Sequence, residues 1–130
     1  MTTMSDELVL IVDDNEKNVK LARDVLRFAG FRTIEAGTGR EGLSLAGEHL
    51  PDVILLDIRL PDMDGGSVVR LLKGEPRTAR IPVVAVTSFA MKGDRERFLA
   101  EGFDGYLEKP ISVREFPGQV RGYCEAKEAP

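Results

Sequence analysis

Five side chains that could do chemistry directly follow short strand-like runs of the chain. Asp13 and Asp14 come directly after one apolar run, and Asp57 comes directly after another. Thr87 follows a third run and Lys109 a fourth. If these runs are parallel strands of one sheet, their carboxyl ends meet at one edge, which is where α/β sheets bind ligands. The spacing therefore predicts that three carboxylates, a hydroxyl and an ammonium group lie together.

Three carboxylates at one edge repel one another, so either one takes up a proton or a hard divalent cation lies among them. An all-oxygen site with few protein ligands suits Mg²⁺, and Mn²⁺ shares this ligand preference. The Lys109 ammonium and the Thr87 hydroxyl can each donate to a phosphoryl oxygen, and a carboxylate between cation and ammonium can attack phosphorus. A single Asp at a strand end is more often a helix cap, so the hypothesis depends on all five positions coinciding.

Hydrophobic periodicity predicts alternating strands and helices that position these groups. The expected strands are 8–12, 32–35, 53–56, 82–86 and 104–107. The expected helices are 15–29, 38–48, a third ending near 73, one capped by Asp94 and ending at 102, and a last one capped by Ser112. Because Pro117, Gly118 and Gly122 are poor residues for a helix interior, we expect the last helix to start late, kink or fray.

The order of these elements predicts the fold class. Strands that alternate with helices over short connections indicate a parallel sheet covered by helices on both faces. Five βα units favour a doubly wound sheet over a barrel, which needs eight. The predicted fold is therefore α/β, a (βα)5 doubly wound five-stranded parallel sheet with the flavodoxin-like strand order 2-1-3-4-5.

Composition narrows the class of protein. The chain of 130 residues fits one domain, and no apolar run approaches the ~20 residues that span a bilayer. We therefore expect a cytoplasmic protein without membrane insertion. A net charge of −4 without a basic tract argues against direct binding of nucleic acid. Cys124 is the only cysteine, which excludes an intrachain disulfide and a cysteine-based zinc site.

The same residues lie in motifs that resemble the receiver domain of bacterial two-component response regulators. The matching pieces are Val12-Asp13-Asp14-Asn15, Leu56-Asp57-Ile58-Arg59-Leu60-Pro61-Asp62-Met63-Asp64-Gly65, Val86-Thr87-Ser88, Tyr106 and Lys109-Pro110. The resemblance runs from about Val9 to about Val120 and is greatest with DivK-like single-domain regulators, especially over Ile81–Phe116. With it we expect a flexible arm over 1–7, a receiver domain over 8–124, a short tail over 125–130 and no output domain.

The resemblance implies a role for each residue of the acidic edge. Asp57 would be the phosphoacceptor. Asp14, Asp57 and the backbone carbonyl of Arg59 would bind Mg²⁺, and Asp13 would act mainly through bound water. Lys109 would contact the phosphoryl group.

The resemblance also implies a switch. Thr87 would contact the phosphoryl group as well, and with Tyr106 it matches the pair that couples phosphorylation to the face formed by the fourth helix, last strand and last helix. On phosphorylation Thr87 would move toward the phosphoryl oxygen and the Tyr106 ring would turn inward, which is a two-state population shift. Lys109-Pro110 is a candidate cis peptide.

The implied function is that of a single-domain response regulator in a phosphorelay. It would accept a phosphoryl group on Asp57 from a sensor histidine kinase or a histidine phosphotransfer protein, and it would signal by binding a downstream kinase or regulator protein. Self-catalysed transfer and autodephosphorylation make such a protein a phosphoacceptor rather than an enzyme. Asn15, Asn18 and Leu21 lie beside the acidic pair. Docking of the phosphodonor would explain these exposed residues, and an ordinary solvent-exposed helix face would explain them equally well.

Three other functions are open. A receiver-like interaction module would keep the fold without being phosphorylated, but the complete set of site residues speaks against it. A haloacid-dehalogenase-like phosphatase also uses an Asp nucleophile and Mg²⁺, but it needs a second Asp two residues later, where this chain has Arg59. A flavin-binding protein of the same fold would need a hydroxyl-rich loop after the first strand, which is lacking here.

Three polar residues carry less weight. His49, the only histidine, is predicted to be a surface residue near the end of the second helix rather than a phosphohistidine. Asp62 and Asp64 suggest a calcium loop, but Leu60 and Leu71 occupy its first and last ligand positions. Asp64 is therefore predicted to be a helix cap.

Overall fold

Five short segments form one parallel β-sheet in the computed structural model, which describes residues 7–88 and 93–128. The strands are β1 Leu8–Val12, β2 Arg32–Ala36, β3 Val53–Asp57, β4 Val83–Thr87 and β5 Gly105–Glu108. They lie in the order β2-β1-β3-β4-β5, and every neighbouring pair is parallel. The central strands can be apolar throughout because helices cover both of their faces. The predicted fold class and strand order are confirmed.

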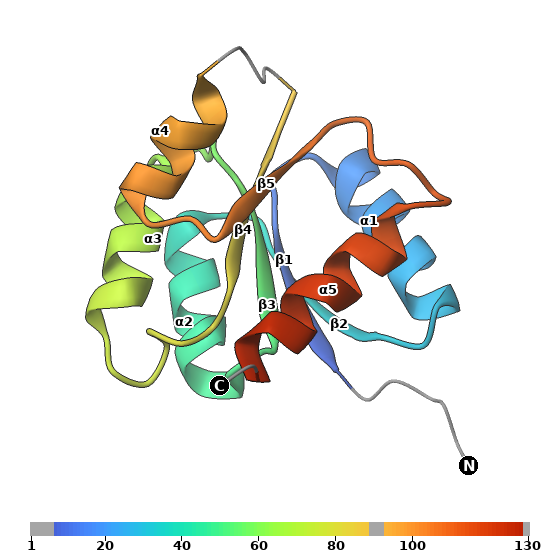
Figure 1. Cartoon of the computed structure of the whole chain (residues 1–130), viewed down its shortest axis with the longest axis horizontal. Coiled ribbons are helices and arrows are strands. Elements are labelled where there is room, and N and C mark those ends of the chain that lie inside the picture. The colour runs from blue at the N-terminus through green and yellow to red at the C-terminus, as the bar shows by residue number, and fades with distance from the viewer. Residues whose placement is uncertain (1–6, 89–92, 129–130) are drawn as a thin grey trace.

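The helices form two layers, one on each face of the sheet (Figure 1). They are α1 Glu16–Phe28, α2 Gly39–His49, α3 Gly65–Gly74, α4 Asp94–Glu101 and α5 Phe116–Glu128. Helices α1 and α5 cover one face, and α2, α3 and α4 cover the other. Within residues 7–88 and 93–128, none of the helices combines the length and the apolar composition needed to cross a membrane.

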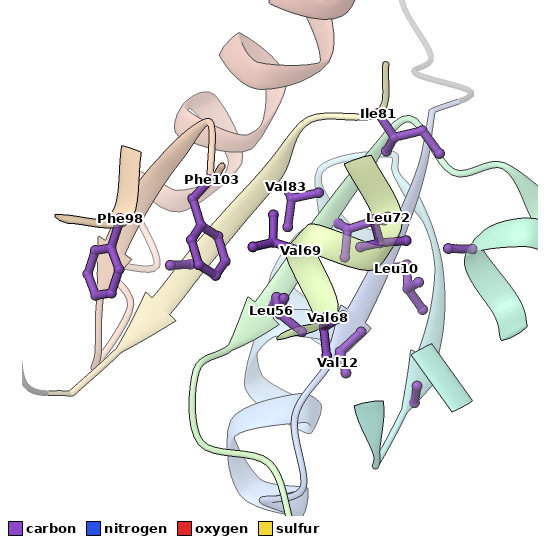
Figure 2. Packing of buried hydrophobic residues seen from close by; sticks show 14 residues of the cluster. Leu10, Val12, Leu56, Val68, Val69, Leu72, Ile81, Val83, Phe98 and Phe103 are labelled. Atoms are coloured by element: carbon purple, nitrogen blue, oxygen red, sulfur yellow. The ribbon is translucent and has the colours of Figure 1, made fainter. Parts of the chain in front are cut away.

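Two hydrophobic clusters hold the layers together, and alternate residues of the central strands point into each. Leu10 and Val12 belong to the cluster under α2, α3 and α4, while Val9 and Ile11 belong to the cluster under α1 and α5. Figure 2 shows the first cluster, in which side chains of α3 face those of the strands. Burial of one Leu or Val side chain stabilises the fold by about 1.5–3 kcal/mol. The backbone that leads to the acidic edge is therefore firmly held.

Side chains cap the starts of α1, α2 and α3, but the predicted side-chain cap of α4 is wrong. Asn15, Thr38 and Asp64 each accept hydrogen bonds from amides of the first turn that follows them. The prediction that Asp94 caps α4 is wrong, because the cap position belongs to Gly93, whose φ is 91°. Glycine adopts this backbone conformation without strain, so the helix begins one residue earlier and Asp94 becomes its first residue.

The last helix starts late, as its glycines and proline predicted. The prediction that Ser112 caps this helix is wrong: its Oγ accepts a hydrogen bond from the Glu115 amide at 3.2 Å, but this bond closes a turn, and α5 begins only at Phe116. Pro117 lies in the first turn of α5, where no intrahelical amide donor is needed. The helix includes residues 125–128 of the predicted tail. Residues 1–6 of the predicted arm and 129–130 of the tail lie outside the described residues.

Gly105 of β5 is a position where a side chain has no room, since a Cβ would overlap the ring and hydroxyl of Tyr123 on α5. We expect Gly105→Ala to displace Tyr123 and to lower the free energy of unfolding by about 1–2 kcal/mol. Gly122, also on α5, is the matched control because no atom lies within 4 Å of its missing Cβ.

Alanine favours a helix over glycine, so Gly122→Ala should raise the free energy of unfolding by about 0.5–1 kcal/mol. Urea denaturation followed by circular dichroism measures both changes. A Gly105→Ala protein as stable as the wild type would contradict the packing of Tyr123.

Candidate functional site

The three predicted carboxylates meet at the carboxyl edge of the sheet because β1 and β3 are neighbours. Each of Asp13, Asp14 and Asp57 offers a carboxylate oxygen, and these oxygens lie within 4.8 Å of one another. Asp13 and Asp57 are buried, with 7% and 8% of their surfaces exposed, whereas Asp14 is exposed. Solvent therefore reaches the cluster most freely at Asp14.

Backbone amides orient the two buried acids. The Asp13 Oδ1 accepts a hydrogen bond from the Asn15 amide at 2.9 Å, and the Asp57 Oδ1 accepts one from the Arg59 amide at 3.0 Å. In both cases the amide lies two residues after the acid, which is a turn that Asp forms readily at the end of a strand. The other oxygen of each carboxylate faces Lys109. Local sequence thus aims both acids into the site.

Lys109 is brought to the acids by the pairing of β5 with β4. Its amide donates to the Thr87 carbonyl at 2.8 Å, and the Lys109–Pro110 peptide that follows is cis. The Lys109 Nζ lies 3.0 Å from the Asp13 Oδ2 and 3.2 Å from the Asp57 Oδ2. One ammonium group therefore bridges two acids that are far apart in the sequence.

Lys109 lies beside two of the three acids of the cluster, Asp13 and Asp57. Burial is the main reason why the pKa of Asp57 lies above its ordinary value, and the Asp13 charge raises this pKa further. The hydrogen bond from the Arg59 amide and the Lys109 charge lower the pKa but do not cancel the rise. Burial acts to lower the pKa of Lys109, but the hydrogen bonds and charges of Asp13 and Asp57 outweigh it and raise that pKa. Lys109 thus stays charged, and burial together with the Asp13 charge makes Asp57 resist losing its proton.

Thr87 and Tyr106 lie on the neighbouring strands β4 and β5. Thr87 ends β4, is almost fully buried, and lines a hollow together with Asp14, Asp57 and Lys109. Tyr106 lies opposite Ala85 and is half-buried, with its ring centroid 5.8 Å from that of Phe98 on α4. The structure therefore brings Thr87 into the site and leaves Tyr106 farther along the sheet, beside α4.

The donor set of the site fits a hard divalent cation. All of its charged ligand atoms are oxygens, and they lie close enough together to share one ion. The mutual repulsion of three neighbouring carboxylates favours a cation further. Arg59, whose carbonyl is predicted to bind the ion directly with Asp14 and Asp57, lines the same hollow as these two acids.

Sequence reasoning missed the part played by Asp62. Its carboxylate accepts hydrogen bonds from the Gly39 amide at 2.7 Å and the Arg40 amide at 3.0 Å, and these amides hold the pKa of Asp62 below its ordinary value. Asp64 caps α3, as predicted, by accepting from the Ser67 amide at 2.7 Å. Both acids of the suspected calcium loop therefore accept hydrogen bonds from amides at helix N-termini. No local signal pairs Asp62 with a helix 23 residues earlier.

His49 lies where it was predicted. It is the last residue of α2, is exposed, and its Nε2 lies 3.7 Å from the Glu48 carboxylate. It does not belong to the acidic cluster.

Comparison with known proteins finds one family. The family model of the response regulator receiver domain matches residues 9–121. The chain is 49% identical over 115 residues to the polar-differentiation response regulator DivK of Brucella ovis, a match that covers 88% of this chain and 94% of that protein.

Solved structures of similar fold come from the same family. A CheY-like response regulator receiver domain protein from Methanospirillum hungatei is 28% identical with a TM-score of 0.83, and the match covers 95% of this chain and 98% of that one. The receiver domain of a sensor histidine kinase from Pseudomonas aeruginosa is 31% identical with a TM-score of 0.84, and the match covers 93% of this chain and 99% of that one. That structure holds a magnesium ion in its active-site cleft.

The crowding of negative charge predicts that ionised Asp57 opposes folding when no divalent cation is present. Its pKa is higher in the folded protein than the ordinary 3.8, so its contribution favours folding at low pH and is lost as the pH rises through the raised value. Asp57→Asn, which keeps the shape without the charge, should therefore be more stable than the wild type in EDTA at pH 7.

The difference should shrink as the pH falls toward about 3, where Asp57 is mostly protonated in both the folded and the unfolded state. Urea midpoints at the two pH values measure it. A less stable Asp57→Asn protein at pH 7 would mean that the ion pair with Lys109 outweighs the repulsion.

Proposed function

The chain belongs to the response regulator receiver family, and from this premise we propose that Asp57 is its phosphoacceptor, with a sensor histidine kinase or a histidine phosphotransfer protein as the donor. As a receiver of the DivK-like kind, the protein is a signalling phosphoacceptor rather than an enzyme. The observation that carries the proposal is the position of Asp57, a buried carboxylate between two other acids and the Lys109 ammonium. We propose residues 8–124 as the extent of the receiver.

In the transfer, a carboxylate oxygen of Asp57 forms a bond to phosphorus while the bond from phosphorus to the donor's histidine nitrogen breaks. The Arg59 amide and Lys109 hold the two oxygens of Asp57, so the nucleophile is oriented before the donor arrives. As negative charge builds on the phosphoryl oxygens, the Lys109 ammonium can stabilise it, and the Thr87 hydroxyl can donate a hydrogen bond.

We propose that Mg²⁺ binds at this site and that Mn²⁺ can replace it. Asp14, Asp57 and the carbonyl of Arg59 would hold the ion directly, and Asp13 would hold it through water. The bound ion would supply positive charge that screens the acids from the incoming phosphoryl group. The all-oxygen donor set supports this assignment, as does the magnesium ion in the similar Pseudomonas receiver.

We propose that the phosphodonor docks over the hollow between α1 and the loop after β5. Asn18 and Leu21 of α1 and Ile111 of the loop line this hollow, and so do Asp57 and Lys109. Leu21 is 38% exposed, which is high for a leucine and leaves an apolar contact available. A donor helix seated here would bring its phosphohistidine to Asp57. Kinases that use ATP work in the cytoplasm, which is the compartment that we propose.

We propose that Thr87 and Tyr106 transmit the change. Movement of the Thr87 hydroxyl toward a phosphoryl group would empty space beside β5, into which the Tyr106 ring could turn. The α4–β5–α5 face would then differ between the two states, and a downstream kinase or regulator that prefers one state would shift the population. The contact between Tyr106 and Phe98 supports this route, because it connects β5 to α4.

Mass spectrometry after incubation with Mg²⁺ and acetyl phosphate tests the phosphoacceptor. We expect the wild type to gain about 80 Da, the mass of one phosphoryl group, and neither Asp57→Asn nor an EDTA-treated sample to gain it. Lys109→Ala should be phosphorylated at least tenfold more slowly, on the order of the loss from one charge-stabilising donor. A wild type that gains no mass would leave an interaction module with a receiver fold. Turnover of a phosphate ester would instead favour a phosphatase.

Amide NMR shifts on addition of beryllofluoride, which mimics a phosphoryl group on a carboxylate, test the switch. In the wild type, we expect changes both near Asp57 and along α4, β5 and α5. Thr87→Ala should keep the changes near Asp57 and lose most of those around Tyr106, because the hydroxyl that responds to the phosphoryl group is gone. Ser88→Ala is the neighbouring control and should retain both sets. Equal responses in Thr87→Ala and the wild type would remove Thr87 from the switch.

A further inference from the structure

The tip of the loop between β3 and α3 is bound to the N-terminus of α2. The two oxygens of Asp62 accept hydrogen bonds from the Gly39 and Arg40 amides, at 2.7 and 3.0 Å. These are the first amides of α2, and such amides have no partner inside their helix. The helix's own cap, Thr38, serves the Glu41 amide at 3.0 Å. Asp62 therefore completes the capping of α2 from a different part of the chain.

A close contact accompanies these hydrogen bonds. Gly39 is buried, and a Cβ at this position would overlap the Met63 side chain and lie 3.0 Å from Val68. The loop can approach α2 only because residue 39 has no side chain. Asp62 itself is exposed, so water competes for its two hydrogen bonds, whereas the contact of Met63 is unaffected by that competition. We call the two contacts together the Asp62–α2 tie.

Further hydrogen bonds close the loop on itself. The Arg59 amide donates to Asp57, the Gly65 amide donates to the Ile58 carbonyl at 3.1 Å, and Arg59 pairs with Asp64 in an antiparallel bridge. All of these partners lie between the end of β3 and the start of α3. The loop also packs on the hydrophobic core through Ile58, Leu60 and Met63, and the tie adds the hydrogen bonds that join its tip to α2.

The tie connects the two sides of the acidic cluster. Helix α2 starts three residues after Ala36, the end of β2, and the Ala36 carbonyl accepts a hydrogen bond from the Asp13 amide at 3.0 Å. On the other side, Asp57 and Arg59 belong to β3 and the loop that Asp62 holds. The distance between the two sides therefore depends on the tie as well as on the sheet.

We propose that Asp62 is a positioning residue for the metal site. By holding the loop against α2, it keeps the Arg59 carbonyl at a constant place relative to the acids at the end of β1. Partners of this indirect kind typically change metal affinity by about 10- to 100-fold when they are lost. The inference rests on the proposed function, in which the Arg59 carbonyl binds Mg²⁺.

Calorimetric titration with Mg²⁺, at constant ionic strength, tests the proposal. Asp62→Ala should raise the Kd for Mg²⁺ about tenfold, the low end of the usual range. Gly39→Ala should raise it by a similar factor, because the added methyl pushes Met63 away while Asp62 remains. Since both changes break one tie, the double variant should bind Mg²⁺ little worse than either single variant. Faster exchange of the backbone amide hydrogens at positions 39 and 40 reports independently that the tie is open.

Two controls separate position from charge and from loss of stability. Thr38→Ala removes α2's own cap but leaves the tie, so its Kd should equal that of the wild type. Asp62→Asn loses the charge but keeps one acceptor, so its Kd should rise less than about threefold.

Equal Kd values for Asp62→Ala, Thr38→Ala and the wild type would overturn the proposal. Equal weakening by Asp62→Ala and Asp62→Asn would also overturn it, since charge alone would then explain the effect. A wild type that binds no Mg²⁺ would refute the proposed function and the inference with it, which is a different result from either of these.

Discussion

The excess of negative charge at the carboxyl edge of the sheet is the constraint on which the rest of the structure depends. Three carboxylates share this edge with one ammonium group, and two of the acids are buried. Buried charges persist only where hydrogen bonds or opposite charges hold them. Asp13 and Asp57 each have one oxygen on a backbone amide and the other near Lys109. The acids are thus held in place without being neutralised, a state that favours uptake of a cation.

Holding such charges together requires a scaffold that does not yield to their repulsion. The sheet provides it, because β1 and β3 are buried on both faces and paired along their length. The strand ends alone do not shape the whole site, since Arg59 lies in a loop. The hydrogen bonds of Asp62 to α2 connect that loop to the side of the molecule that carries Asp13. The core thus holds the strand ends that carry Asp13 and Asp57, and the hydrogen bonds of Asp62 hold the loop that carries Arg59.

Lys109 connects the acidic site to the neighbouring strands β4 and β5. The Lys109 amide is bound to the Thr87 carbonyl, and Lys109 directly follows β5, the strand that carries Tyr106. Tyr106 in turn contacts Phe98 of α4. Lys109, which lies beside Asp57, is therefore connected through β5 and Tyr106 to α4. The proposed switch would use this connection.

The sequence by itself determined the order of strands and helices, because apolar runs and helical periodicity reflect which residues must be buried. It also determined the acidic edge, since parallel strands bring their carboxyl ends together wherever the acids stand in the chain. Only the tertiary structure decided which distant residues contact one another and where α4 is capped. The hydrogen bonds of Asp62 to α2, the packing of Tyr123 over Gly105 and the N-cap of α4 at Gly93 rather than Asp94 all depend on contacts through space or on one backbone angle. Local sequence patterns do not predict such contacts, because the partners are brought together only when the chain has folded.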